Sequence, residues 1–262
     1  MRVVLLGALD AWLSRTIAAG LAPLARASDL EAAGAAERRG VEPIADLAEL
    51  VVRLSPPRFF LLDAPPDRVD AVIDEASRAI EPGDVVLDCA RSWWCDTLRR
   101  HRRLRHRALH HLDVAEARGP AGPLLLVGGR PDAVALARPL LETLARPGRM
   151  VVAGGPGAAH WAGEVTAALA TARARAESEA RALLEAFPGG LDAEAVAAAL
   201  GFGETAADGR AAWLADDALR LQAPAPLLAL AAMQRLEEAL EELEDDPPPP
   251  RLGPFAWPRE IL

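Results

Sequence analysis

The amino-terminal part of the chain alternates between short apolar runs and stretches whose apolar residues recur at helical spacing. Residues 2–7 (RVVLLG), 58–66 (RFFLLDAPP) and 81–90 (EPGDVVLDCA) are typical of buried strands. Between the last two, residues 67–80 (DRVDAVIDEASRAI) carry their apolar side chains on one helical face. Strands that alternate with helices of about 10–15 residues indicate βαβ units. We therefore predict an α/β domain with a mainly parallel sheet over residues 1–154.

After Gly157 the pattern becomes helical throughout. Residues 158–187 contain neither a proline nor a pair of glycines, and they predict one long helix. Further helical stretches extend to about residue 245, so we predict an all-α domain over 155–246. The last segment, 247–262, begins with four consecutive prolines and predicts an extended, proline-rich tail.

Charge, hydrophobicity and cysteine spacing argue against several kinds of partner and site. The formal net charge of −9 argues against nucleic acids and anionic membranes as main partners. No stretch has the features of a signal peptide or a transmembrane helix, so we expect a cytoplasmic protein. Cys89 and Cys95 make no disulfide framework and lack the spacing of a zinc pair, so reduced thiols are expected.

Three residue types are missing from the chain, and their absence limits its chemistry. All 29 basic residues are arginine, and the sequence contains no lysine, tyrosine or asparagine. A lysine base, a tyrosine acid and an asparagine clamp are therefore excluded. Any catalysis must come from His, Asp, Glu, Cys, Ser, Thr or Arg.

The turn after the first strand resembles part of a dinucleotide-binding fingerprint. In G-x-G-x-x-G the glycines allow a tight turn, the approach of a pyrophosphate and close helix packing. Gly7 keeps the turn, but the next two positions hold Leu9 and Trp12. Asp10 adds negative charge where an anion would bind, although it is also a good helix cap. We expect cofactor binding to fail first at Leu9 and Trp12.

Several strings, in order, resemble the 6-phosphogluconate dehydrogenase family of the β-hydroxyacid dehydrogenase superfamily. Residues 81–100 (EPGDVVLDCARSWWCDTLRR) are similar to the family's E-P-G-D-I-V-I-D-G-G-N-S-x-Y-x-D-T. Residues 109–119 (LHHLDVAEARG) and 154–169 (GGPGAAHWAGEVTAAL) resemble its F-L-D-V-G-x-S-G-G and G-P-x-G-A-G-H segments. The resemblance implies a Rossmann-like NADP-binding domain followed by an all-α domain that forms a homodimer through its helices; another protein is an alternative partner.

The resemblance also implies where NADP would bind. The candidate positions lie in the first turn, at the end of the second strand, after the 58–63 strand and in the following loop: Gly7, Leu9, Asp10, Arg26, Ser28, Ala64, Pro65 and Arg91. Arg26 and Ser28 would hold a 2′-phosphate, and the alternative is a surface arginine with a helix cap. The altered fingerprint leaves NADP binding in question.

The family's catalytic residues are largely absent from the matching positions. Counting from His160, which matches the family's histidine, its Lys, Asn and Glu become Gly163, Ala167 and Ala170. Ser92 is kept from the substrate loop, so Ser92 and His160 are the catalytic candidates. Arg235 matches an arginine that reaches the partner's substrate, with a solvated helix residue as the alternative. Trp93 and Trp94 are expected to fill part of the cleft.

Three functional hypotheses remain from the sequence. The first is a catalytically silent dimeric scaffold or regulator with a degenerate NADP site. The second is an NAD(P)-dependent oxidoreductase, similar to imine or hydroxyacid reductases, with Asp63, His160 or Glu164 as proton donor. The third is an anion sensor that uses Arg102, Arg103 and Arg105 of the Arg-rich segment 99–107; a solvated helix is its alternative.

Overall fold

The computed structural model describes residues 2–7, 10–26, 30–119, 122–185, 190–202, 213, 216–217, 220 and 226–234. Leu9, Ser28, Arg235 and the tail 247–262 lie outside these ranges, as does the side chain of Asp10. The chain forms two compact units, Met1–Thr166 and Ala167–Leu262, and their boundary falls within one helix. The sequence places its domain boundary slightly earlier, at 154/155.

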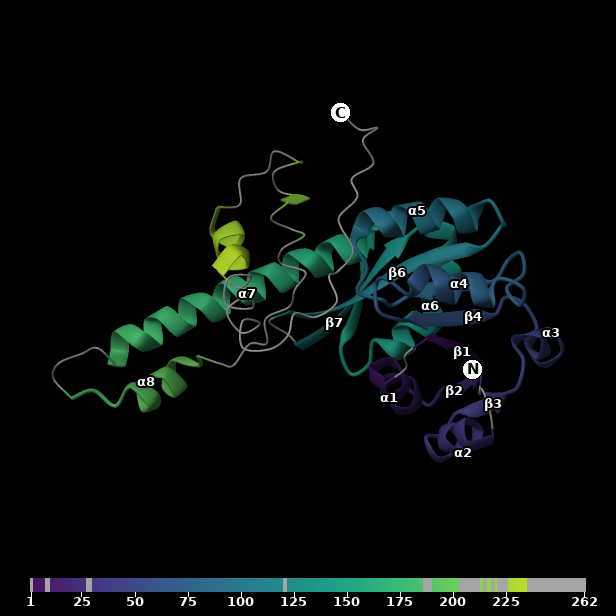
Figure 1. Ribbon diagram of the computed structural model, residues 1–262, viewed down its shortest axis with the longest axis horizontal. Coiled ribbons are helices and arrows are strands. Elements are labelled where there is room, and N and C mark those ends of the chain that lie inside the picture. The colour runs from purple at the N-terminus through teal and green to yellow at the C-terminus, as the bar shows by residue number, and fades with distance from the viewer. Residues whose placement is uncertain are drawn as a thin grey trace, which may run out of the picture. The chain divides into compact units, whose positions relative to one another are not determined.

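The first unit is built on an eight-stranded sheet with the order β3-β2-β1-β4-β5-β6-β7-β8 (Figure 1). β6 and β7 pair antiparallel, and all other neighbours pair parallel. The first six strands thus have the order of dinucleotide-binding folds, with the switch point between β1 and β4. The strands are β1 (Arg2–Gly7), β2 (Ala22–Arg26), β3 (Glu42–Ile44), β4 (Phe59–Asp63), β5 (Val85–Asp88), β6 (His110–Gly119), β7 (Gly122–Gly129) and β8 (Arg149–Gly154).

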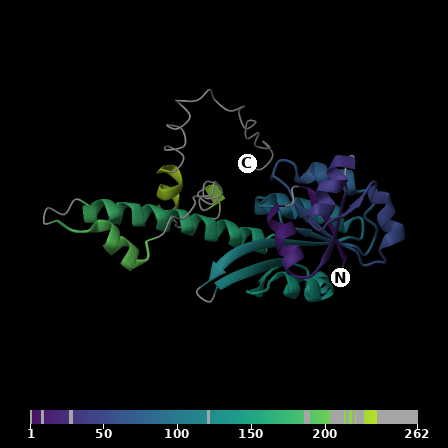
Figure 2. The ribbon, with the colours of Figure 1, turned by 90° about the horizontal axis from the view of Figure 1, so that it is seen from below.

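Helices cover both faces of this sheet (Figure 2). They are α1 (Asp10–Ala18), α2 (Leu30–Arg38), η1 (Leu47–Glu49), α3 (Leu50–Arg53), α4 (Val69–Ala76), α5 (Trp94–Arg105) and α6 (Pro131–Leu144). The α/β pattern predicted from the sequence is confirmed, with one omission. The three-residue β3 was not predicted, because its short sequence EPI has no periodicity of its own.

Alternation along the strands divides the core between the two faces. Val3 and Leu5 belong to the cluster that contains Trp12 of α1 and the buried face of α6. Val4 and Leu6 belong to the cluster that contains Ile73 of α4 and residues of α3 and α5. Successive strand residues point to opposite faces, so a strand apolar at every position is buried on both sides.

All the described secondary-structure elements of the second unit are helices. α7 (Ala158–Glu185) starts in the first unit and continues into the second, close to the predicted span of 158–187. In α8 (Ala193–Leu200), the Asp192 side chain accepts a hydrogen bond from the Ala195 N–H, and Gly201 ends the helix in a left-handed conformation. No described helix has the length and apolarity needed to cross a membrane.

Candidate functional site

The carboxyl ends of β1, β4 and β5 lie at one edge of the sheet, because these strands are parallel neighbours. Gly7 ends β1 with a φ of +95°, and a Cβ atom there would lie 2.1 Å from the Asp63 carbonyl oxygen. Only glycine fits this turn, since both the conformation and the space exclude a side chain. The prediction that Gly7 preserves the tight turn is therefore supported by the geometry.

Trp12 is accommodated inside the core. Its side chain is buried in the cluster that includes α6, and the Arg15 guanidinium lies 5.4 Å from its ring centroid. Arg15 Nη1 also donates to the carbonyl oxygen of Leu144 at the end of α6, at 2.8 Å. α1 therefore packs against the core through the Trp12 ring, at the position where the fingerprint has its third glycine.

The other cofactor candidates have varied surroundings. Arg26 is exposed at the end of β2 and forms an ion pair with Glu75 of α4. After β4, Ala64 is buried and Pro65 is exposed, and Arg91 is exposed beyond β5. The side chain of Arg26 already has an acidic partner, so a bound phosphate would compete with Glu75 for it.

Ser92 is held by a buried arginine of α5. Arg100 is 1% exposed, and its Nη1 donates to Ser92 Oγ at 2.7 Å. The same guanidinium donates to Asp70 Oδ2 of α4 at 3.2 Å and to the Pro66 carbonyl oxygen at 3.3 Å. Ser92 is itself only 2% exposed, so this network fixes the loop after β5 and turns the hydroxyl inward.

His160 is bonded through both ring nitrogens. Nδ1 lies 2.7 Å from the Thr97 hydroxyl, and Nε2 lies 3.1 Å from the Asp88 carbonyl oxygen. A carbonyl oxygen only accepts, so Nε2 carries a proton, and Nδ1 pairs with the Thr97 hydroxyl. The side chain is 2% exposed. His160 therefore joins α7 to α5 and β5, and neither nitrogen faces solvent.

A buried carboxylate from the sheet binds the start of α7. Asp113 of β6 accepts from the backbone N–H of Gly157 and Ala159 at 2.8 Å and of His160 at 3.1 Å. These are among the N–H groups that a helix start leaves without internal partners. Asp113 is fully buried, so its charge is compensated chiefly by these dipoles.

The start of α5 is bound in turn by α7. Glu164 is fully buried, and its Oε1 accepts from the Trp94 backbone N–H at 3.0 Å. The Trp94 ring meets Trp161 of α7 edge to face, with centroids 5.8 Å apart. Trp94 thus packs against α7, and its filling of the cleft stays a prediction. Gly163, at the position of the family's lysine, lies one residue before Glu164 and is buried.

Burial and neighbouring cations act in opposite directions on Asp88. Burial alone raises its pKa, but the nearby imidazole of His111 and the charges of His160 and Arg100 outweigh it and lower the pKa. Its Oδ2 lies 3.6 Å from His111 Nε2. Asp88 is therefore an anion in the interior, surrounded by donors from α5, β6 and α7.

The buried thiol beside it is unsuited to nucleophilic chemistry. Burial, with smaller contributions from Asp88 and Asp63, raises the pKa of Cys89 well above its usual value. The thiol is thus protonated at neutral pH. Cys89 and Cys95 form no disulfide with any described residue, and no group of three or more His, Cys, Asp or Glu residues in the described ranges could hold a metal ion.

The Arg-rich segment 99–107 does not present a single cationic face. Arg99, Arg100 and Arg103 form ion pairs with Asp70 of α4, and Arg103 also pairs with Asp74. Of the arginines assigned to an anion sensor, Arg103 is therefore already neutralised by α4. The acidic side chains of a neighbouring helix explain much of the basic run.

Sequence reasoning missed the two carboxylates that bind helix starts. Asp113 stood in a string chosen for resemblance alone, and Glu164 was considered only as a proton donor. A charged residue within an otherwise apolar strand, as in LDVA, is the signal that could have identified Asp113. Its partners lie 44 to 47 residues later, so only the tertiary structure reveals them.

Comparison with known proteins gives a consistent result. Residues 16–155 match the family described as the NAD binding domain of 6-phosphogluconate dehydrogenase. The chain is 24% identical over 233 residues to "Putative 6-phosphogluconate dehydrogenase YqeC" of Bacillus subtilis (strain 168), covering 78% of both chains. It is 33% identical over 110 residues to the decarboxylating 6-phosphogluconate dehydrogenase of Bacillus licheniformis, covering 40% of this chain and 24% of that one.

Solved structures share the fold at low sequence identity. A Mycobacterium tuberculosis 3-hydroxyisobutyrate dehydrogenase has a TM-score of 0.70 at 18% identity, with 92% of this chain and 94% of that one covered. Plasmodium falciparum 6-phosphogluconate dehydrogenase also gives 0.70, at 17% identity and with 94% and 63% covered. An imine reductase from Pseudomonas sp. gives 0.57, at 17% identity and with 93% and 87% covered.

Proposed function

The chain belongs to the family of the NAD-binding domain of 6-phosphogluconate dehydrogenase, and on that premise we propose that it lacks 6-phosphogluconate dehydrogenase activity and acts as a dimeric scaffold or regulator. One observation carries the proposal. The buried position 163, where the resemblance places the lysine base, is glycine, and the chain contains no lysine to replace it. General base catalysis typically contributes about 10²–10⁴-fold to a rate.

The remaining candidates are poorly placed to replace that base. His160 uses Nε2 to reach the Asp88 carbonyl oxygen and Nδ1 to reach Thr97. The Ser92 hydroxyl accepts from the buried Arg100. A general base needs an accessible lone pair within reach of the substrate proton. In both residues the polar atoms instead maintain the contacts between β5, α5 and α7.

The described part of the cofactor edge fits a dinucleotide only in part. The Gly7 turn and the strand switch point are those of a nucleotide-binding sheet. Arg26, Ala64 and Arg91 would contact the cofactor, which when bound supplies a hydride acceptor or donor. Arg26 would first have to leave Glu75. We therefore propose that NADP binds weakly at this edge, with an affinity below that of an active family enzyme.

Two measurements on the purified full-length protein test the proposal. The first follows NADPH formation from 6-phosphogluconate with NADP and with NAD. The second titrates NADPH by fluorescence and calorimetry. The expected results are no turnover above background and a Kd above about 100 μM, equivalent to a binding free energy weaker than about −5.5 kcal/mol. Turnover of 6-phosphogluconate would refute the proposal, and micromolar NADPH binding would refute its account of the cofactor site.

A second candidate is an NAD(P)-dependent oxidoreductase that acts on another small substrate. The observation in its favour is the similarity in fold to a 3-hydroxyisobutyrate dehydrogenase and an imine reductase, which extends over 94% and 87% of those chains. NADPH consumption with a panel of imines and keto acids would support this candidate. Glu164→Gln should then lower kcat if Glu164 donates the proton, whereas a purely structural Glu164 would change stability alone.

The dimer is a separate part of the proposal. We place its interface on the helices of the all-α domain, as the family resemblance implies. Sedimentation equilibrium of the full chain should give twice the monomer mass of 27.7 kDa. A concentration-independent monomer would rule out a dimeric scaffold.

A further inference from the structure

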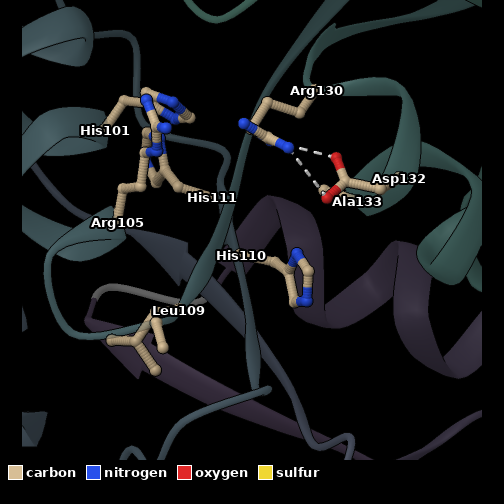
Figure 3. A pocket seen from close by; sticks show the side chains of 9 residues that line it. His101, Arg105, Leu109, His110, His111, Arg130, Asp132 and Ala133 are labelled. Atoms are coloured by element: carbon tan, nitrogen blue, oxygen red, sulfur yellow. Dashed lines mark hydrogen bonds and ion pairs between the residues drawn. The ribbon is translucent and has the colours of Figure 1, made fainter.

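A cationic pocket lies at the amino end of β6, away from the carboxyl ends of β1, β4 and β5. Its cavity volume is about 310 Å³. The lining comes from the end of α5, the start of β6 and the start of α6, and its polar members are His101, Arg105, His110, His111, Arg130 and Asp132. Figure 3 shows His101, Arg105 and His111 gathered on one side, with Arg130 and His110 across from them.

His111 is a buried polar group without hydrogen bonds. Its side chain has no exposed surface, and neither ring nitrogen has a hydrogen-bond partner among the described residues. Nε2 lies 3.6 Å from Asp88 Oδ2, beyond hydrogen-bond distance, and the ring centroid is 5.9 Å from that of His101. Buried polar groups are nearly always paired, so His111 is an unusual group: a titratable imidazole without a hydrogen bond, held in the wall of the pocket and facing Asp88.

The charge of the lining favours an anion. Asp132 is the only acidic residue among the described residues that line the pocket, and it is occupied by Arg130, whose Nε and Nη2 donate to its two oxygens at 3.1 and 3.3 Å. Arg105 makes no hydrogen bond or ion pair with any residue that the structure describes. With neutral histidines the lining carries one net positive charge, since one of two arginines is neutralised, and each protonated histidine adds one more.

Three properties together select the ligand. The volume is at the lower end of the range for small-molecule sites, about 300–1,000 Å³. The donors are guanidinium and imidazole groups, which bind phosphate through charge-assisted hydrogen bonds. The N-terminus of the 14-residue α6 opens beside Arg130, and helix starts favour anions. We propose that this pocket binds a phosphate group, either inorganic phosphate or the phosphoryl end of a small metabolite, through Arg105, Arg130 and the histidines.

Binding should depend on pH through the histidines. Burial, followed by the charges of His111 and Arg105, lowers the pKa of His101, with Arg130 acting in the same direction and Asp113 opposing it. His111 faces Asp88 of β5 and His101 of α5. A bound anion favours the protonated imidazoles, so proton uptake and anion binding must reinforce each other. Affinity should therefore rise as the pH falls from 8 to 6.

The experiment titrates the full-length protein with inorganic phosphate and with sulfate, at constant ionic strength set by chloride. Sulfate keeps its charge between pH 6 and 8, so any change in its affinity reports the protein's histidines. Calorimetry is expected to give at least threefold tighter sulfate binding at pH 6 than at pH 8. Equal sulfate affinity at both pH values would overturn the role assigned to the histidines.

Matched variants locate the site. Arg105→Gln should weaken phosphate binding at least tenfold, and Arg130→Gln should weaken it as well. Arg102→Gln is the control, because it removes the same charge from an exposed position of the same helix and should change the Kd less than twofold. Arg26→Gln, at the cofactor edge, should also have no effect. This last control separates the phosphate site from the proposed NADP site, so either can fail alone.

Histidine resonances provide an independent readout. The chain contains five histidines, so their Cε1–H signals can be assigned by single substitutions. Phosphate should shift the signals of His101 and His111 and leave those of His106 and His160 in place. The proposal would be overturned if Arg102→Gln and Arg105→Gln weakened phosphate binding equally. It would also be overturned if phosphate raised the melting temperature of the protein no more than chloride does.

Discussion

The carboxylate of Asp113 lies directly over Gly128, its partner in the neighbouring strand. The two residues are paired in the antiparallel register of β6 and β7, and a Cβ atom at position 128 would come within 2.6 Å of both carboxylate oxygens. Because Gly128 has no side chain, the Asp113 carboxylate has room to lie over it and to bind the start of α7. The contact between Asp113 and α7 therefore depends on the absence of a side chain at position 128.

The first prediction follows from this contact. Gly128→Ala should lower the free energy of unfolding by about 1–3 kcal/mol, because the new methyl group forces Asp113 away from the N–H groups that it binds. Urea denaturation measures the change. Gly34→Ala is the control: Gly34 lies within α2, where the nearest atom to a new Cβ is 3.4 Å away on a flexible arginine. It should stabilise the protein by up to about 1 kcal/mol.

The second prediction concerns the carboxylate itself. Asp113→Ala leaves the buried N–H groups of Gly157, Ala159 and His160 without an acceptor, and it should cost about 3 kcal/mol or more. Asp192→Ala removes a cap from α8 at an exposed position and should cost about 1 kcal/mol. Thermal and urea unfolding of both variants make the comparison. Similar losses for the two would show that water replaces Asp113.

The third prediction is the acid dependence of Asp88. The pKa of Asp88 is lowered in the folded protein, so its ionisation stabilises the fold above the unfolded-state value near 3.8. That stabilisation is lost as the pH falls through the lower, folded-state pKa. Asp88→Asn should therefore be less stable than the natural chain at pH 5–7, and the difference should shrink below pH 4. A difference that stays constant down to the acid transition would contradict this account.

The fourth prediction tests Arg26. Arg26→Gln should weaken NADPH binding about tenfold relative to NADH, since only NADPH carries a 2′-phosphate. Its stability should change by no more than about 1 kcal/mol, because the ion pair with Glu75 is exposed. Arg53→Gln is the control, because it breaks an exposed pair with Glu42 on a different element. Parallel loss of NADPH and NADH affinity would remove Arg26 from the 2′-phosphate site.

The sequence predicts the frame of this protein well and its interior contacts poorly. Apolar runs such as VVLLG and the long uninterrupted helix after Gly157 are local signals, and both appear in the structure where they were expected. The ion pairs between the Arg-rich segment and α4 were not predictable from the sequence, because Asp70 and Asp74 lie about 30 residues earlier. The inward orientation of Ser92 follows from Arg100, and that contact exists only once α5 has packed against the sheet.

The bond from Glu164 to Trp94 also has a consequence for synthesis on the ribosome. The acceptor follows the donor by 70 residues, so the start of α5 has no such partner until the first turns of α7 have emerged. Asp113 likewise has none of these N–H partners until residues 157–160 have been synthesised. Domains generally fold as units during translation. A nascent chain released at residue 154 would contain every strand of the sheet, yet it would expose two unfinished helix contacts to chaperones and proteases.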